Sequence, residues 1–212
     1  MKKFTIKSNK YLEKDVVAYA HKNYEGGIGR HNIDGTIENL IISLKNNNGD
    51  ASVSKIATAV MNLEEILEKD LPEIYKNNFG SGEEIVVVCV PRSKANFKDC
   101  QLLFRKTVKN VVKSLDSAFT DGTNHIKRHT STKTTHKTCF AEKGENPGGS
   151  GSMPYVGITA KTCDISNQVE GKNILLIDDL YTSGVNVCED CLQTLLQKGA
   201  KNVIFYCVGV AI

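Results

Sequence analysis

Two adjacent acids and a short glycine-containing turn are the residues of this sequence best suited to chemistry. Asp178 and Asp179 follow the apolar run 173–177, and the turn 182–186 (TSGVN) precedes a segment with helical spacing of apolar residues. Because ligands of open parallel sheets bind at the carboxyl ends of strands, the carboxylates are expected at such an edge. The turn would offer backbone N–H groups and hydroxyls at a helix N-terminus, which favours an anion. This layout fits vicinal hydroxyls beside a phosphate, as in ribose 5-phosphate.

The elements that must position these residues alternate between strand and helix from residue 85 onward. Helical stripes of apolar residues cover 104–115 and 187–195. Three continuous apolar runs have the composition of strands buried on both faces: 85–90, 173–177 and 202–210. This order predicts an α/β fold with an open, mostly parallel sheet flanked by helices and joined by right-handed crossovers.

The N-terminal part of the chain has a different pattern. Apolar residues recur with helical spacing over 37–44 and 53–67, and the polar segment 45–50 (KNNNGD) separates the two. We therefore expect residues 1–82 to form a helical N-terminal region, which we call the hood. Residues 83–212 are expected to form the α/β core.

Composition favours a cytoplasmic protein with reduced thiols. The chain has 212 residues, a net charge of +3, seven Cys and no secretory or membrane-spanning apolar run. A charge this small does not by itself argue for nucleic acid. Cys188 and Cys191 form a C-x-x-C pair on a predicted apolar helix stripe, which favours core packing over zinc or redox work.

The segment 126–156 interrupts the core. Its first part lies within a basic run, 125–137, that contains four Lys or Arg, three His and no acid. A loop of this length in a compact domain is usually functional or disordered. An active-site loop, a solvated loop and a nucleic-acid patch remain open, although no aromatic residue interleaves the basic run to stack on bases.

The stretch ILLIDDLYTSGVN (174–186) resembles the signature with which type I phosphoribosyltransferases bind phosphoribosyl pyrophosphate. The resemblance implies that Asp178 and Asp179 hold the ribose 2′- and 3′-hydroxyls. It also implies that the turn holds the 5′-phosphate, through Thr182, Ser183, Gly184, Val185 and Asn186. The order of elements is most similar to the ComF-like branch of that family.

The same resemblance assigns roles elsewhere in the core. The loop after the first buried strand would bind pyrophosphate through Arg92, Ser93 and Lys94. The mobile loop 126–156 would close over the site, and its candidate catalytic residues are Lys127, Arg128, Lys133, His136 and Lys137. Mg²⁺ would arrive with the substrate, without a direct protein ligand. The hood would take the acceptor.

The leading hypothesis is a phosphoribosyltransferase, a pentosyltransferase of nucleotide metabolism that transfers the phosphoribosyl group to an unidentified acceptor and releases pyrophosphate. One alternative is a catalytically silent sensor or interaction module that keeps the nucleotide site. Another is a ComF-like protein linked to DNA handling, which would bind DNA in a salt-dependent manner. Dimers are common among the proteins that this chain resembles, and a homodimer stays open.

Overall fold

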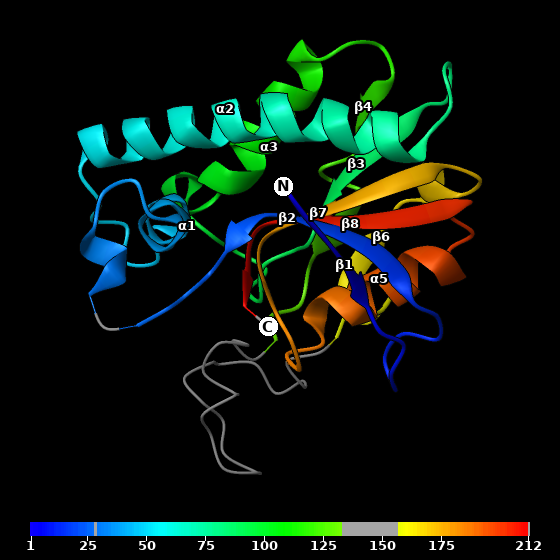
Figure 1. The fold of residues 1–212 in the computed structure, drawn as a ribbon. Helices are drawn as coiled ribbons and strands as arrows, with labels where there is room; N and C mark the ends of the chain where they lie inside the picture. Colours follow the sequence, from blue (N-terminus) through cyan, green and yellow to red (C-terminus); the bar gives the residue numbers. More distant parts are fainter. Residues whose placement is uncertain (28, 133–156, 212) are drawn as a thin grey trace.

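The computed structural model describes residues 1–27, 29–132 and 157–211, which form an α/β fold around a mostly parallel sheet (Figure 1). The described strands of this sheet number six, in the order β1-β2-β8-β7-β3-β4, and β1 is the strand that runs antiparallel to its neighbour. In chain order they are β1 (Lys2–Ile6), β2 (Val16–Asn23), β3 (Ile85–Cys89), β4 (Phe119–Asp121), β7 (Asn173–Thr182) and β8 (Asn202–Ala211). A separate antiparallel pair consists of β5 (Ile126–Arg128) and β6 (Cys163–Ile165).

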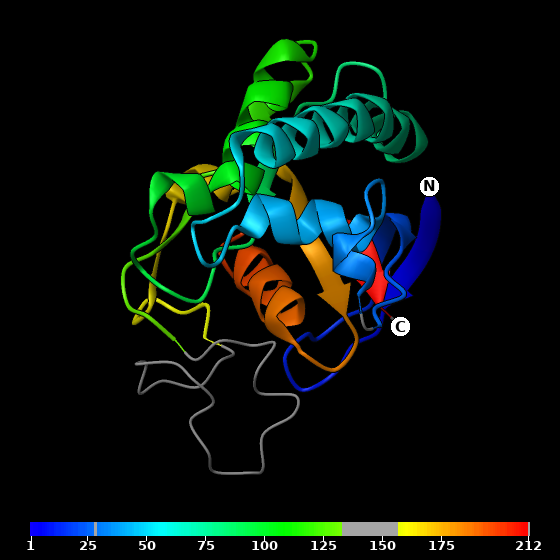
Figure 2. The same ribbon diagram turned by 90° about the vertical axis from the view of Figure 1, so that its left-hand side faces the viewer.

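Helices cover both faces of the sheet (Figures 1 and 2). Three of them pack on one face: α1 (Ile37–Lys45), α2 (Val53–Asn78) and α3 (Leu103–Ser114). The other face packs against α5 (Val187–Gln197). Short 3₁₀ turns lie at Arg30–Asn32, Asp99–Gln101 and Asn167–Val169. The predicted α/β class with a mostly parallel, helix-flanked sheet is confirmed.

The central strands are apolar because both of their faces are buried. Leu175 and Ile177 of β7 join the core under α1–α3, whereas Ile174 and Leu176 join the core under α5. Two separate hydrophobic layers therefore hold the sheet between its helices. None of the helices in the described ranges is long and apolar enough to cross a membrane.

The expectation of a helical region over residues 1–82 is wrong for its first part. Residues 2–6 and 16–23 are β1 and β2, which extend the sheet beyond β8. The reason is the short run VVAYA (16–20), in which Ala18 and Ala20 are buried on the α5 side and Tyr19 on the other. The helical expectation is correct from Ile37 to Asn78, apart from the predicted break between the two helices.

Strand β7 is longer than the apolar run 173–177 suggests. It continues to Thr182, because Leu180, Tyr181 and Thr182 pair with Gly209, Val210 and Ala211 of β8. Asp178 and Asp179 therefore lie within the strand, four and three residues before its last residue. Thr182, which was expected in the turn, is the last residue of the strand, and the turn starts at Ser183.

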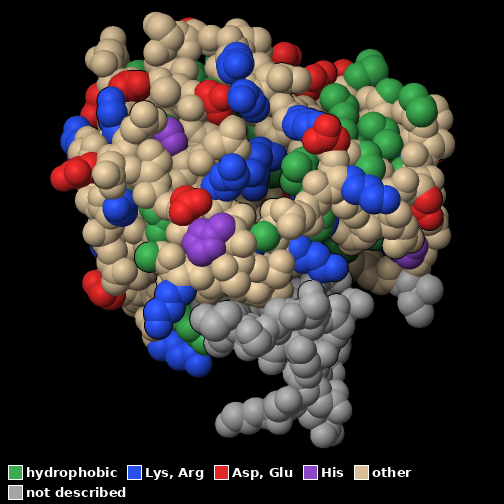
Figure 3. All heavy atoms as spheres, turned by 180° about the vertical axis from the view of Figure 1, so that it is seen from behind, with side chains coloured by type: hydrophobic (Ala, Val, Ile, Leu, Met, Phe, Trp, Pro, Cys, Tyr) green, Lys and Arg blue, Asp and Glu red, His purple; other side chains and the backbone are tan. Residues whose placement is uncertain are grey.

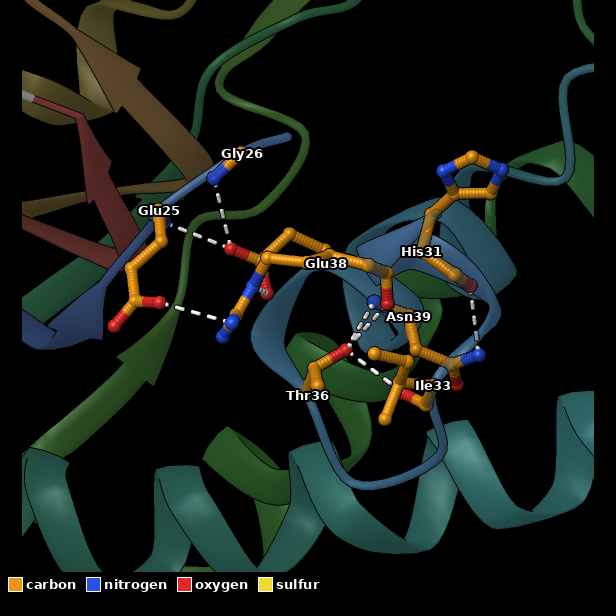
Figure 4. Close-up of polar contacts among 8 residues, drawn as sticks. Glu25, Gly26, His31, Ile33, Thr36, Glu38 and Asn39 are labelled. Atoms are coloured by element: carbon orange, nitrogen blue, oxygen red, sulfur yellow. Dashed lines mark hydrogen bonds and ion pairs between the residues drawn. The ribbon is translucent and has the colours of Figure 1, made fainter. Parts of the chain in front are cut away.

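The N-terminus of α1 is fixed by side-chain bonds to the loop that follows β2 (Figure 4). The buried carboxylate of Glu38 accepts N–H bonds from Glu25 at 2.7 Å and Gly26 at 3.1 Å. Burial alone would raise the pKa of Glu38, but these N–H groups and the nearby Arg30 outweigh burial and lower it. Thr36 caps the helix by accepting the N–H of Asn39 at 3.1 Å. Together these bonds fix where α1 begins.

Buried polar side chains connect α2 to the sheet. Asp70 of α2 is 1% exposed, and its carboxylate accepts the hydroxyl of Tyr206 in β8 at 2.8 Å. The same oxygen lies 2.9 Å from Nδ1 of His21 in β2. His21 is therefore a half-buried partner of a core acid.

We expect Tyr206→Phe to lower the free energy of unfolding by about 1.5 kcal/mol, because a buried carboxylate then loses one hydrogen bond. Urea denaturation measures this change. The matched control is Tyr11→Phe, since the Tyr11 hydroxyl donates no hydrogen bond to the described residues and should leave the stability unchanged. Equal stability of the two variants would contradict a structural role for the Tyr206–Asp70 bond.

Candidate functional site

The two predicted acids lie on the central strand β7 near the carboxyl edge of the sheet, and their side chains face opposite layers. The thiol of Cys188 in α5 is 3.5 Å from Oδ2 of Asp178. Oδ1 of Asp179 is 3.0 Å from the ammonium of Lys45 in α1. The N–H of Asp179 also donates to Oδ1 of Asp178 at 2.8 Å. This alternation follows from strand geometry, in which successive side chains point to opposite faces.

The environment of Asp178 opposes its negative charge. Burial and then the neighbouring charge of Asp179 raise the pKa of Asp178 to about 7, against the lowering effects of Lys45 and of the two hydrogen bonds. A carboxyl group with such a pKa costs the folded state free energy whenever it is ionised. Strongly shifted groups of this kind are concentrated at functional sites.

Lys45 is the site residue that the sequence analysis missed. It is the last residue of α1, and its ammonium faces the acidic pair across the carboxyl edge of the sheet. Burial would lower the pKa of Lys45, but the charges of Asp179 and Asp178 outweigh burial and raise it. Lys45 therefore carries its positive charge beside the two carboxylates.

The turn after β7 has an unusual backbone. Gly184 adopts φ +83° and Asn186 adopts φ +64°, in the left-handed region that L-residues with a side chain rarely enter. The amide of Asn186 donates to the carbonyl of Gly184 at 2.7 Å, and Asn9 donates to Asn186 Oδ1 at 3.0 Å. These two bonds hold the strained residue at the start of α5. Strain of this kind is typical of ligand-binding turns.

This turn also presents free hydrogen-bond donors. Within the described residues, no hydrogen bond is made by the backbone N–H groups of Gly184, Asn186, Val187 and Cys188. The last two open α5, so the helix dipole adds to their attraction for an anion. The acids of the first turn are engaged elsewhere: Glu189 accepts the Tyr181 hydroxyl at 2.9 Å, and Asp190 accepts the N–H of Ile158 at 2.7 Å. Of the predicted turn residues, Gly184 and Asn186 have free N–H groups, whereas those of Ser183 and Val185 donate to the carbonyls of Ala211 and Thr182. The free donors from Gly184 to Cys188 form a cradle that could receive an anion.

The predicted pyrophosphate residues have different surroundings from one another. Arg92 donates to the carbonyls of Lys45 and Gln101 and to the side chain of Asn47, and its guanidinium lies 4.1 Å from the ring centre of Phe97. Ser93 is half-buried, and Lys94 is exposed. Arg92 is therefore occupied with the chain itself, and Lys94 is the predicted cation that remains free to move.

The predicted loop 126–156 begins as part of the fold. Arg128 in β5 is 7% exposed, and it donates to the carbonyls of Arg92 at 2.7 Å and Gly157 at 3.2 Å. Arg128 therefore connects two backbone segments through its hydrogen bonds. A guanidinium that is engaged in this way is a poor candidate for a catalytic role. Lys127 is exposed. The other candidates, Lys133, His136 and Lys137, lie outside the described residues.

The C-x-x-C pair belongs to the core. Cys188 and Cys191 are buried under the α5 face of the sheet, and burial raises the pKa of both thiols. In the described ranges, no three His, Cys, Asp or Glu side chains come together in a way that could hold a metal ion. The packing interpretation of this pair agrees with its burial.

Some of the basic residues on the surface are paired with acids. Figure 3 shows Lys and Arg side chains grouped near the middle of one face, with Asp and Glu beside them. On α3, Lys106 lies 3.2 Å from Asp99 and Lys109 lies 3.7 Å from Asp121. Paired charges of this kind form a weaker nucleic-acid surface than a continuous basic stripe would.

A scan against protein-family models finds no match for the chain, and a search of curated proteins finds no significant match. The functional argument therefore rests on the carboxylate pair and on the free N–H groups at the start of α5.

Proposed function

We propose that this protein is a phosphoribosyltransferase with the type I fold, which binds phosphoribosyl pyrophosphate together with Mg²⁺. The observation that carries the proposal is the sequence of features on one strand and one turn: two carboxylates on β7, followed by a cradle of free N–H groups at the start of α5. Ribose 5-phosphate carries both kinds of group on one molecule, hydroxyls for the carboxylates and a phosphate for the N–H groups.

Each part of the site has a distinct task in the proposed reaction. The carboxylates of Asp178 and Asp179 would accept the ribose hydroxyls, and the N–H groups of Gly184, Val187 and Cys188 would hold the 5′-phosphate. Displacement of pyrophosphate from C1 needs positioning and electrostatic stabilisation rather than a side-chain nucleophile. Mg²⁺ would arrive with the substrate and would neutralise charge on the leaving pyrophosphate.

A second candidate is a sensor that binds phosphoribosyl pyrophosphate without turning it over. It is favoured by the engagement of Arg92 and Arg128 with backbone carbonyls, because neither guanidinium is free to stabilise departing charge. The same fold supports both functions.

A pyrophosphate-release assay separates the two candidates. The protein is mixed with phosphoribosyl pyrophosphate, Mg²⁺ and a panel of nitrogen-containing acceptors. We expect pyrophosphate release that depends on one class of acceptor and that an Asp179→Asn variant loses. Saturable ligand binding without release under any acceptor would favour the sensor, and the absence of both binding and release would contradict the proposed function.

A further inference from the structure

The ion pair between Lys45 and Asp179 joins the hood to the acidic pair. The ammonium of Lys45 is 3.0 Å from Oδ1 of Asp179, and the two side chains are 30% and 13% exposed. Lys45 thus contacts the carboxylate of Asp179, which would bind a ribose hydroxyl in the proposed function. Since the lysine is partly exposed, its flexible stem can turn toward solvent or toward a ligand at this edge.

The backbone of Lys45 is held in place although its side chain is free to turn. Nη1 of Arg92 donates to the carbonyl of Lys45 at 3.0 Å, and the same group donates to the carbonyl of Gln101. Arg92 also donates to the side chain of Asn47, two residues after Lys45. These bonds connect the end of α1 to the loop that follows β3. The start of α1 is fixed independently by Glu38.

The packing of α1 on the sheet further restricts where Lys45 can lie. A Cβ atom at Gly209 of β8 would come within 3.0 Å of Ile37 and 3.1 Å of Ile41. The glycine therefore lets α1 approach the carboxyl end of β8 closely. Both ends and the middle of α1 are fixed, so the backbone of Lys45 is held at one place beside the acidic pair while its side chain can turn.

We propose that Lys45 is a substrate-binding residue that leaves Asp179 when phosphoribosyl pyrophosphate and Mg²⁺ enter and then binds an oxygen of the pyrophosphate, with Arg92 as its positioning residue. This inference rests on the proposed function. The exchange makes and breaks ion pairs only. Lys45 would then have the pyrophosphate-binding role that was expected of Arg92. Arg92 already donates to the carbonyls of Lys45 and Gln101.

The inference separates two parts of the ligand. Ribose 5-phosphate contacts the carboxylates and the cradle but carries no pyrophosphate, so its binding should not need Lys45. Phosphoribosyl pyrophosphate should lose a charged contact when Lys45 is shortened to an uncharged side chain. Loss of such a contact corresponds to a decrease in affinity of about 10- to 100-fold.

Calorimetric titration of both ligands into wild type and variants tests this inference. We expect Lys45→Met to weaken phosphoribosyl pyrophosphate about 10- to 100-fold, to leave ribose 5-phosphate within about threefold, and to be rescued in large part by Lys45→Arg. The matched control is Lys69→Met, an exposed lysine of α2 outside the site, which should leave both affinities within about twofold. Circular dichroism verifies that each variant is folded.

Three other outcomes would overturn the inference in distinguishable ways. Equal loss of both ligands in a folded Lys45→Met variant would show that Lys45 supports the carboxylates rather than the pyrophosphate. Unchanged affinity of Lys45→Met for phosphoribosyl pyrophosphate would remove Lys45 from the site and leave the proposed function intact. Failure of wild type to bind either ligand would instead overturn the proposed function, and the inference with it.

Discussion

Replacing both Asp178 and Asp179 with Asn is expected to weaken the binding of phosphoribosyl pyrophosphate with Mg²⁺ by about 100-fold or more. Each carboxylate would lose a charge-assisted bond to a ribose hydroxyl, and such bonds contribute about 1.5 to 3 kcal/mol each. The substitution keeps the size of both side chains, so the strand and its neighbours should be preserved. Isothermal titration calorimetry with ligand and Mg²⁺ measures the change.

The control for this experiment is a second pair of Asp→Asn changes at exposed positions. Asp50 and Asp164 are exposed and outside the site, and the Asp50→Asn/Asp164→Asn variant removes the same net charge. It should retain the affinity of wild type within about twofold. If both double variants bound the ligand as wild type does, the acidic pair would be no part of a ribose site.

The single change Asp178→Asn is expected to make the protein more stable at about pH 8, by about 2 to 4 kcal/mol. Burial and Asp179 raise the pKa of Asp178 to about 7, well above its usual value. Between pH 4 and pH 7 the folded state therefore binds more protons than the unfolded state, and stability falls as pH rises through this window. Asn removes that loss, since it is never ionised.

Urea denaturation of wild type and Asp178→Asn at about pH 4 and pH 8 checks this sign. The two proteins should be equally stable at the lower pH, where Asp178 is protonated in the fold. Asp121→Asn is the matched control with the opposite sign: burial would raise the pKa of Asp121, but the hydrogen bonds from Thr123 and the charges of Lys109 and Lys113 lower it. That variant should lose stability at the higher pH. Destabilisation by Asp178→Asn at pH 8 would mean that the ionised carboxylate is a structural contact.

These two results together would describe a group kept for function at the expense of stability. A carboxylate on a buried strand, beside a second carboxylate, is unfavourable in the empty protein. A ligand that supplies hydroxyls and Mg²⁺ would relieve that repulsion. The stability gained by Asp178→Asn and the binding lost by the double variant therefore have one physical cause.

The central strands could be predicted because strands that are buried on both faces have continuous apolar sequences. The runs 85–90 and 202–210 correspond closely to β3 and β8. Strand β2 has a comparable but shorter run, VVAYA, between polar segments, and its partner β8 lies at the other end of the chain. Nothing local to residues 16–20 indicates that pairing, which is why the N-terminal region was expected to be helical.

The roles of the basic residues could not be predicted, because charge alone does not reveal the partner of a side chain. Arg92 and Arg128 were expected to contact anions, and both instead donate to backbone carbonyls. Lys45 was overlooked because it is the last residue of an ordinary helix and reaches Asp179 only through the fold. The position of the acids near the carboxyl edge of the sheet and of the turn before α5 could be predicted, because both follow from one local stretch of sequence.

The most direct test of the central claim is an amide NMR titration of wild type with ribose 5-phosphate. The account predicts saturable shifts that are largest at the N–H groups of Gly184, Asn186, Val187 and Cys188, with a second set at Asp178 and Asp179. Inorganic phosphate should shift the cradle alone. Shifts confined to other parts of the chain, or no saturable shift in the cradle, would contradict a ribose-phosphate site at the carboxyl end of β7.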